Sequence, residues 1–160
     1  MLEIRRATLK DMKMLIPLAF ALQAYEAELE EAVKVTPKTR QDLERFIGKN
    51  LRRKDARFFM AFEDDRIAGY ASGWLSKANI SASGKSYGFI CDSYVLESHR
   101  GRGIGKRLVT ELIQWFNEQD VEYIEVYTYV NNDLGKGFWE SEGFRPNMIR
   151  YLRKMGKIPK

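Results

Sequence analysis

One loop constrains this chain of 160 residues more than any other segment. Glycines recur at alternate positions, Gly101, Gly103 and Gly105, between a strand-like run and a helix-like run. Glycine lets a ligand approach the backbone closely, and successive N–H groups at a helix N-terminus form a cradle that favours phosphates. The flanking side chains are cationic: Arg100, Arg102, Lys106 and Arg107. The segment therefore predicts a phosphate-binding corner between a strand and a helix, in preference to a flexible turn with solvated charges.

The spacing of the loop disfavours two common nucleotide-binding motifs. The pattern G-x-G-x-x-G requires a third glycine where Lys106 stands. The pattern G-x-x-x-x-G-K-[ST] requires a glycine at Arg100 and a hydroxyl residue at Arg107. A dinucleotide dehydrogenase and a P-loop NTPase are therefore largely excluded.

The hydrophobic periodicity along the rest of the chain predicts an α/β fold. Strands are expected over Leu2–Ala7, Arg57–Phe62, Ile67–Leu75, Tyr87–Leu96, Val121–Val130 and Phe144–Leu152. Helices are expected from Met12 to Leu22, Thr39–Arg53, Ile104–Gln119 and Asn132–Ser141. Thr8 and Asp11 form a near capping box ahead of the first helix. The order of elements indicates one sheet with strands of mixed direction.

Composition indicates a single soluble domain over residues 1–160. Hydrophobic residues make up 44% and charged residues 31%, and the N-terminus has no apolar leader. Cys91 is the only cysteine and His99 the only histidine, which excludes an internal disulfide and a Cys/His zinc site and fits a reducing cytoplasm. The net charge of +5 equals the five Lys and Arg residues of a basic tail at 150–160. A solvated terminus explains this tail better than a nucleic-acid-binding site does.

Four segments together resemble the GCN5-related N-acetyltransferase (GNAT) family. Arg100, Gly103 and Gly105 meet the pattern [RQ]-x-x-G-x-[GA]. The other three segments that look like the family's are Ile4 to Asp11, Ile67 to Tyr70, and Asn132 with Gly143-Phe144. The resemblance covers nearly the whole chain. It implies a mixed, mostly antiparallel twisted sheet of six to seven strands flanked by helices, the acyl-CoA acyltransferase fold of that family.

The resemblance also implies acetyl-CoA as cosubstrate and no metal. The pyrophosphate is expected on the backbone from Gly101 to Lys106, and the pantetheine arm beside β-strand residues, with a backbone N–H near Val95 polarising the thioester carbonyl. The cofactor-binding residues implied are Tyr94, Val95, Leu96, Arg100, Gly101, Arg102, Gly103, Ile104, Gly105, Lys106 and Asn132. Asn132 is equally expected as a helix N-cap.

Acetyl transfer to an amine needs a group that takes the ammonium proton. Asp92 stands where polyamine-type members of the family carry an acid, and it is our first candidate, either as base or as an anchor for a cationic amine. A purely structural aspartate is an equal alternative. Cys91 and Gly135 depart from the family pattern, and Trp139 replaces a tyrosine that often serves as general acid. The acid therefore stays unassigned among Tyr94, Tyr127, Tyr129 and solvent.

The acceptor side of the site is expected on the first two helices. The first helix carries Glu26, Glu28, Glu30 and Glu31, which favours a cationic amine, although at least half of these are expected on a solvated face. Phe20, Tyr25, Trp74 and Tyr87 are candidates for a pocket wall, but their spacing is more typical of core residues.

The leading hypothesis is an N-acetyltransferase that acts by direct transfer on a primary amine of a small molecule or peptide. The alternative from another class is a non-catalytic acyl-CoA sensor or interaction module on the same fold. Nucleic-acid binding through the basic tail ranks last, and a homodimer with the last strand as pairing element is a further expectation. No membrane partner is expected.

Overall fold

The sheet is built around a hairpin whose residues alternate between two cores. The computed structural model describes residues 1–77 and 86–156. Its strands are β1 Leu2–Arg6, β2 Ala56–Glu63, β3 Arg66–Ser76, β4 Tyr87–Val95 and β5 Ile124–Val126. Asp64 and Asp65 join β2 to β3 with positive φ angles of 49° and 63°, which matches the twist of a tight hairpin. The strand order is β1-β2-β3-β4-β5, antiparallel except for the parallel β4–β5 pair.

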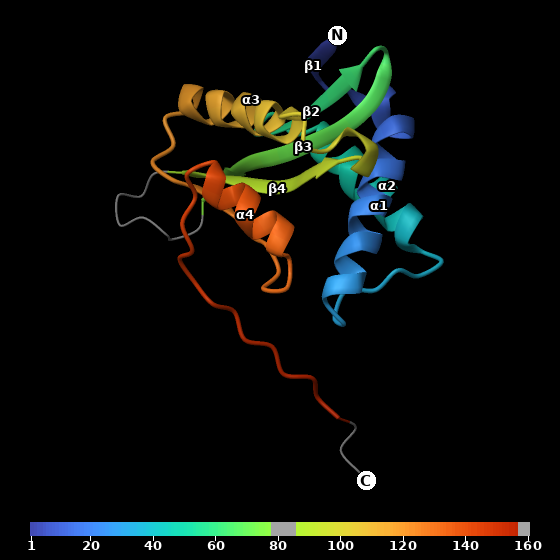
Figure 1. Ribbon diagram of the computed structural model, residues 1–160, viewed down its shortest axis with the longest axis vertical. Helices are drawn as coiled ribbons and strands as arrows, with labels where there is room; N and C mark the ends of the chain where they lie inside the picture. The colour runs from blue at the N-terminus through green and yellow to red at the C-terminus, as the bar shows by residue number, and fades with distance from the viewer. Residues whose placement is uncertain (78–85, 157–160) are drawn as a thin grey trace.

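Helices cover both faces of this sheet (Figure 1). The helices are α1 Met12–Leu29, α2 Thr39–Leu51, α3 Ile104–Glu118 and α4 Asp133–Ser141, with short 3₁₀ turns at Leu9–Asp11 and Glu97–His99. One face packs against α3 and α4 around Leu108, Leu112 and Phe116. The other face packs against α1 and α2 around Leu15, Ile47 and Phe58. The helix predicted from hydrophobic periodicity at Ile104–Gln119 is confirmed, and Leu108, Leu112 and Phe116 on its apolar face are fully buried.

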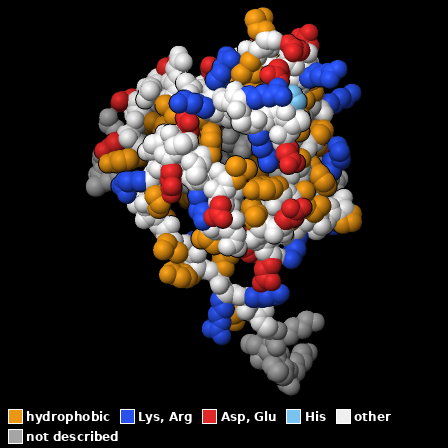
Figure 2. Space-filling view, viewed as in Figure 1, with side chains coloured by type: hydrophobic (Ala, Val, Ile, Leu, Met, Phe, Trp, Pro, Cys, Tyr) orange, Lys and Arg blue, Asp and Glu red, His pale blue; other side chains and the backbone are white. Residues whose placement is uncertain are grey.

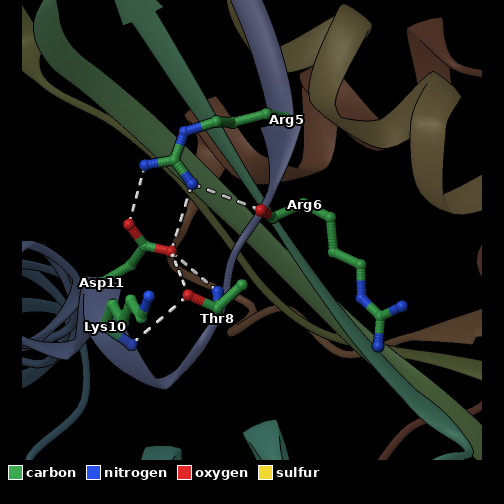
Figure 3. Close-up of polar contacts among 5 residues, drawn as sticks. All are labelled: Arg5, Arg6, Thr8, Lys10 and Asp11. Atoms are coloured by element: carbon green, nitrogen blue, oxygen red, sulfur yellow. Dashed lines mark hydrogen bonds and ion pairs between the residues drawn. The ribbon is translucent and has the colours of Figure 1, made fainter.

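The corner between β1 and α1 fixes where the first helix begins (Figure 3). Asp11 accepts two hydrogen bonds from the Arg5 guanidinium, at 2.7 and 3.1 Å, and others from the Thr8 backbone N–H and hydroxyl. The Thr8–Asp11 capping box predicted from the sequence is therefore confirmed. The arginine and the backbone N–H hold the pKa of the Asp11 carboxyl at about 2, below its usual 3.8.

One strand prediction is wrong and another is too long, and the sheet of the described residues has five strands instead of six to seven. The fifth strand covers only Ile124–Val126 of the expected Val121–Val130, because β5 pairs with β4 over three residues. Residues 144–152 form no strand. This segment, which contains Pro146, runs away from the sheet (Figure 1), and no strand of the described residues lies beside it to satisfy its backbone.

Two further segments of the chain are described only in part. Most of the connection between the strands expected at Ile67–Leu75 and Tyr87–Leu96, and the last four residues of the basic tail, lie outside the described residues. The described part of the tail, 150–156, is exposed and has no regular structure. None of the helices in the described ranges has the length and apolar character needed to cross a bilayer.

Candidate functional site

β4 and the edge strand β5 separate after a short paired segment and leave an open edge on β4. The parallel pairing stops at Ile90 and Val126, so β4 has no neighbour on that side from Cys91 onward among the described residues. A glycine in β3 sets the close approach of the strands here, because a Cβ at Gly69 would lie 2.5 Å from the Tyr94 carbonyl oxygen. The edge is therefore a place where an extended ligand can pair with backbone groups.

The backbone of Val95 faces this open edge. The Leu96 N–H donates to Ala68 O at 2.9 Å, which makes Leu96 and Ala68 a hydrogen-bonded pair. The preceding pair, Val95 and Gly69, is then a non-hydrogen-bonded pair, whose N–H and C=O groups point away from the partner strand. The N–H of Val95 is thus directed into the opening between β4 and β5. The Val95 carbonyl is already used, since it accepts from Arg100 Nε at 3.0 Å.

The glycine loop forms a cradle of backbone amides at the start of α3. Gly101 and Gly103 have positive φ angles of 74° and 75°, and Gly103 is the N-cap of the helix. A Cβ at either glycine would meet nothing within 4 Å, so the surface beside the loop is open. The first helical hydrogen bond is donated by Arg107 to Gly103 O, and within the part of the chain that the structure describes the amides from Gly101 to Lys106 have no protein acceptor. Such amides attract anions.

The four cationic side chains around the loop differ in whether they contact other residues. Arg100 lies against the rings of Tyr25 and Tyr94, 5.8 and 5.7 Å from their centroids, in addition to its bond to Val95. Arg102 pairs with Glu63 at 2.6 Å. Lys106 and Arg107 are exposed. Figure 2 shows Lys and Arg side chains gathered around the single histidine, which precedes the loop in the chain. The surface at this end of the molecule is therefore basic, although Arg100 has a structural role.

The remaining loop residues contact the rest of the fold. Ile104 is buried in the core, so only its backbone faces the opening. A Cβ at Gly105 would lie 3.3 Å from the Phe138 ring of α4. A glycine at this position therefore allows α3 and α4 to pack closely. His99 lies 3.7 Å from Glu63 on the surface.

Asn132 caps α4, as the sequence predicted. Its Oδ1 accepts from the Gly135 N–H at 2.9 Å and from the Tyr25 hydroxyl at 3.0 Å, and its Nδ2 donates to Thr128. The side chain leaves no room for an alanine at position 135, since a Cβ there would lie 2.4 Å from Asn132 Nδ2. The glycine that departs from the family pattern is thus coupled to the conformation of Asn132.

A cavity of about 200 Å³ opens between α1, α2 and the centre of the sheet. It contains one acid from α1, Glu26, and one from β4, Asp92. The other lining residues are Ala19, Leu22, Gln23, Leu43, Phe46, Tyr70 and Cys91. The four aromatic residues considered from the sequence as pocket candidates are not in this lining; Phe46 and Tyr70 supply the aromatic walls.

Asp92 lies in this cavity and is held by three neighbouring donors. The hydroxyl of Tyr70 donates to Oδ2 at 3.1 Å, the Ser72 hydroxyl lies 3.5 Å from the same oxygen, and the Cys91 thiol lies 3.5 Å from Oδ1. Burial raises the pKa of the Asp92 carboxyl above its usual value, and these hydrogen bonds oppose the increase. Asp92 lies on the part of β4 that is not paired with β5, three residues before Val95.

Glu26 is the acid of the first helix that reaches this site. Burial raises its pKa to about 7, and the charge of Asp92 adds to the increase. In the sequence, Glu26 is one of four glutamates near the end of the first helix, and composition alone does not single it out. A signal was present, because Glu26 continues the helical spacing of the buried Leu15 and Ala19 through Leu22. Glu28 and Glu31 are exposed, and Glu30 accepts from the Ala32 N–H beyond the helix end.

The residues considered from the sequence as proton donors, and the tryptophan at the position of the usual tyrosine, differ in how deeply they are buried. Trp139 is a core residue, 9% exposed and packed between Phe138 and Phe144, as expected for a residue without an acid role. Tyr127 is 62% exposed and lies beyond the end of β5. Tyr129 also follows β5, and partial burial raises its pKa. Within the described ranges no group of three or more His, Cys, Asp or Glu side chains is arranged to hold a metal ion.

Comparison with known proteins places this arrangement in a family. The chain is similar to a probable acetyltransferase (25% identity, 98% of this chain and 99% of that one covered, TM-score 0.77). It has the fold of a predicted acetyltransferase from Clostridium acetobutylicum solved with acetyl-CoA (20%, 97% and 96%, 0.78) and of an aminoglycoside acetyltransferase from an uncultured soil sample solved with sisomicin (21%, 97% and 97%, 0.72). No curated protein matches its sequence significantly. The model of the acetyltransferase (GNAT) family matches residues 21–144, and the chain therefore belongs to this family.

Proposed function

We propose that this protein is an acetyl-CoA-dependent N-acetyltransferase that transfers the acetyl group directly to a primary amine of a small molecule or peptide. One observation carries the proposal: the open edge of β4 at Val95 lies next to a helix N-terminus whose amides have no protein acceptor among the described residues. An extended thiol ester with a diphosphate at its far end suits this combination, because it needs both a strand-like pairing edge and an anion cradle.

Acetyl-CoA is held through backbone groups in this proposal. The pyrophosphate binds the amides from Gly101 to Lys106, with Arg102 and Lys106 as cationic neighbours. The pantetheine arm lies along the backbone of Tyr94 to Leu96. The N–H of Val95 donates to the thioester carbonyl oxygen and stabilises the oxyanion that develops there. Asn132 and Arg100 contribute by fixing α4 and the end of β4 beside the opening.

The acceptor amine attacks the thioester carbonyl carbon from the side of Asp92. The C–N bond forms, the tetrahedral intermediate collapses, and the C–S bond breaks with release of the coenzyme A thiolate. The acceptor nitrogen, which arrives as an ammonium group, loses two protons in all. One is taken by a carboxylate of the site, and the other reaches the leaving thiolate directly or through solvent.

The state of Cys91 supports direct transfer over an acetyl-cysteine intermediate. Burial raises the pKa of the Cys91 thiol far above its usual value, and the neighbouring Asp92 charge acts in the same direction. The thiolate is the nucleophilic form, so a thiol with such a raised pKa is a poor acetyl acceptor. A ternary complex is the mechanism that the site favours.

The test is acetyl-CoA binding by calorimetry with the variant Gly103→Asp. An aspartate there adds negative charge at the amide cradle, and we expect at least a 10-fold weaker Kd. Gly143→Asp is the matched control, because Gly143 also has a positive φ of 87° and open space around it but follows α4. Equal affinities for the two variants, or no binding by the wild type, would remove the basis of the proposal.

A second assay separates the enzyme from the sensor alternative. Thiol release from acetyl-CoA is measured across a panel of primary amines, and an N-acetyltransferase releases coenzyme A in proportion to acetylated amine. Acetyl-CoA binding without thiol release for any amine would favour the non-catalytic sensor. We place the activity in the cytoplasm, where the single Cys91 stays a thiol.

The C-terminal segment supports a homodimer. Met148, Ile149 and Tyr151 are between 70% and 87% exposed, and no described strand covers the outer edge of β5. We propose that this segment pairs with the β5 edge of a second copy, which would bury its apolar side chains. Light scattering should give a dimer for the full chain and a monomer after truncation at Asn147. A monomeric full chain would overturn this assignment.

A further inference from the structure

We propose that Glu26 is a catalytic base that takes the ammonium proton of the acceptor, and that the acceptor presents a single unbranched primary alkylammonium arm to the cavity. This inference rests on the proposed function, and it names the substrate class and the proton acceptor at that same site. It starts from the contents of the cavity between α1, α2, β3 and β4.

The two acids of the cavity have no cation beside them. None of the residues that line it in the described chain is Lys, Arg or His. Two carboxylates in one partly buried space repel each other, and a bound ammonium would supply the missing counter-charge. The contrast within the molecule is clear, because the buried acid Asp11 has the Arg5 guanidinium at 2.7 Å.

The size and walls of the cavity limit what accompanies the ammonium. Its volume of about 200 Å³ is below the range of about 300–1,000 Å³ that is usual for drug-sized ligands. Ala19, Leu22, Leu43 and Phe46 make its walls apolar away from the two acids. A methylene chain ending in an ammonium group matches a narrow space with apolar sides and an acidic end, whereas a whole sugar ring or a second charge in the chain does not.

The two acids differ in what they can do with the proton. Asp92 is engaged by the Tyr70 hydroxyl, the Ser72 hydroxyl and the Cys91 thiol, so its oxygens are oriented and serve to anchor the ammonium. Among the described residues the Glu26 carboxyl has no hydrogen-bond donor of this kind, and it faces the cavity from α1. The groups that face it are Asp92 and Cys91 from β4, Tyr70 from β3 and Tyr129 after β5.

The acidity of Glu26 suits this role. Burial and the Asp92 charge raise its pKa to about 7, so near neutral pH the side chain interconverts between carboxylate and carboxylic acid. A general base works best when its pKa lies near the operating pH. The carboxylate form takes one proton from the bound ammonium, the neutral amine attacks the thioester carbon, and the second nitrogen proton goes to the departing thiolate. Glu26 then returns its proton to solvent.

The experiment measures thiol release from acetyl-CoA as a function of pH for wild type, Glu26→Gln, Glu26→Asp and the matched control Glu28→Gln, whose residue is exposed on the same helix. The acceptors are n-hexylamine, 1,4-diaminobutane and the branched tert-butylamine. For wild type we expect kcat/KM to rise with pH through about 7 and to favour n-hexylamine over both 1,4-diaminobutane, which carries a second charge, and tert-butylamine. Glu26→Gln should lose that inflection and about 100-fold in kcat/KM, Glu26→Asp should keep an inflection at a lower rate, and Glu28→Gln should match the wild type.

The outcomes separate this inference from the proposed function. A Glu26→Gln variant with the wild-type rate and inflection, or a wild type that prefers tert-butylamine, would overturn the inference while leaving an active acetyltransferase. A wild type that releases no thiol with any amine would overturn both. Acetyl-CoA affinity of Glu26→Gln, measured by calorimetry, should equal that of the wild type, and a large loss there would mean that the substitution acts through the fold.

Discussion

Two regions of this molecule bury carboxylates, and they do so in opposite ways. At the β1–α1 corner, Asp11 is 5% exposed and meets the Arg5 guanidinium and the Thr8 N–H, and its pKa is lowered to about 2. In the cavity under α1 and α2, burial raises the pKa values of Glu26, to about 7, and of Asp92. The same side-chain chemistry thus gives a permanently ionised carboxylate in one place and a titrating one in the other.

The difference teaches how to separate structural from functional acids in this fold. A carboxylate that has a cation and backbone donors is satisfied by the protein itself, and its ionisation stabilises the native state. A carboxylate that is desolvated without a cation is left unsatisfied, and it costs stability that a ligand can recover.

The largest effect is expected for Asp92→Asn. Asparagine keeps the shape and the contacts with Tyr70 and Ser72 but removes the negative charge that anchors the ammonium. We expect kcat/KM for a primary amine to fall about 100-fold, while the Kd for acetyl-CoA stays nearly unchanged. Steady-state kinetics and calorimetry measure both, with Asp42→Asn on exposed α2 surface as control. An unchanged rate would make Asp92 a structural residue.

Asp11→Asn is expected to reduce stability without affecting catalysis. The lowered pKa means that ionised Asp11 stabilises the fold above its unfolded pKa of 3.8 and that this contribution is lost as the pH falls from about 4 to 2. At pH 7 the loss should be about 2 kcal/mol by urea unfolding, and the difference from wild type should vanish near pH 2.

The matched control for this change is Asp55→Asn. Asp55 also pairs with an arginine, Arg53 at 2.9 Å, but its side chain is 49% exposed. Its loss should cost less than about 0.5 kcal/mol, because solvent screens an exposed pair. Equal losses in the free energy of unfolding for Asp11→Asn and Asp55→Asn would show that burial beside a cation does not make Asp11 more stabilising than an exposed ion pair.

The smallest effect has the opposite sign. Because the pKa of Glu26 is raised in the folded state, wild-type stability falls as the pH rises from about 4.5 to 7, where the unfolded chain ionises before the folded one. Glu26→Gln removes this cost, and it should unfold at a higher temperature than wild type at pH 8, by less than about 1 kcal/mol in free energy, since the group is partly solvated. At pH 4 the two should be equal. A less stable Glu26→Gln at pH 8 would show that Glu26 has a structural partner.

Local patterns predicted the parts of this protein that depend on neighbours in sequence. The Thr8–Asp11 capping box joins residues three apart, and the buried face of α3 follows a helical period, so both were predictable. The glycine loop was also readable, because left-handed backbone at Gly103 is a local requirement of the turn into α3. The strand predicted at the C-terminus does not form, because an alternating pattern specifies a strand only where another strand lies beside it. Whether such a partner is present is not a local property of the sequence.

The sequence by itself determined the order of the elements as far as the last helix, the glycine corner and the family of the fold, because these follow from short-range steric and hydrogen-bonding rules. Only the tertiary structure decided that Glu26 and Asp92 share a cavity, that the Arg100 guanidinium binds the Val95 carbonyl, and that Tyr25 reaches Asn132 across 107 positions of the chain. Such contacts depend on how helices cross the sheet, and burial then sets the charge of each carboxyl through the solvent that packing removes.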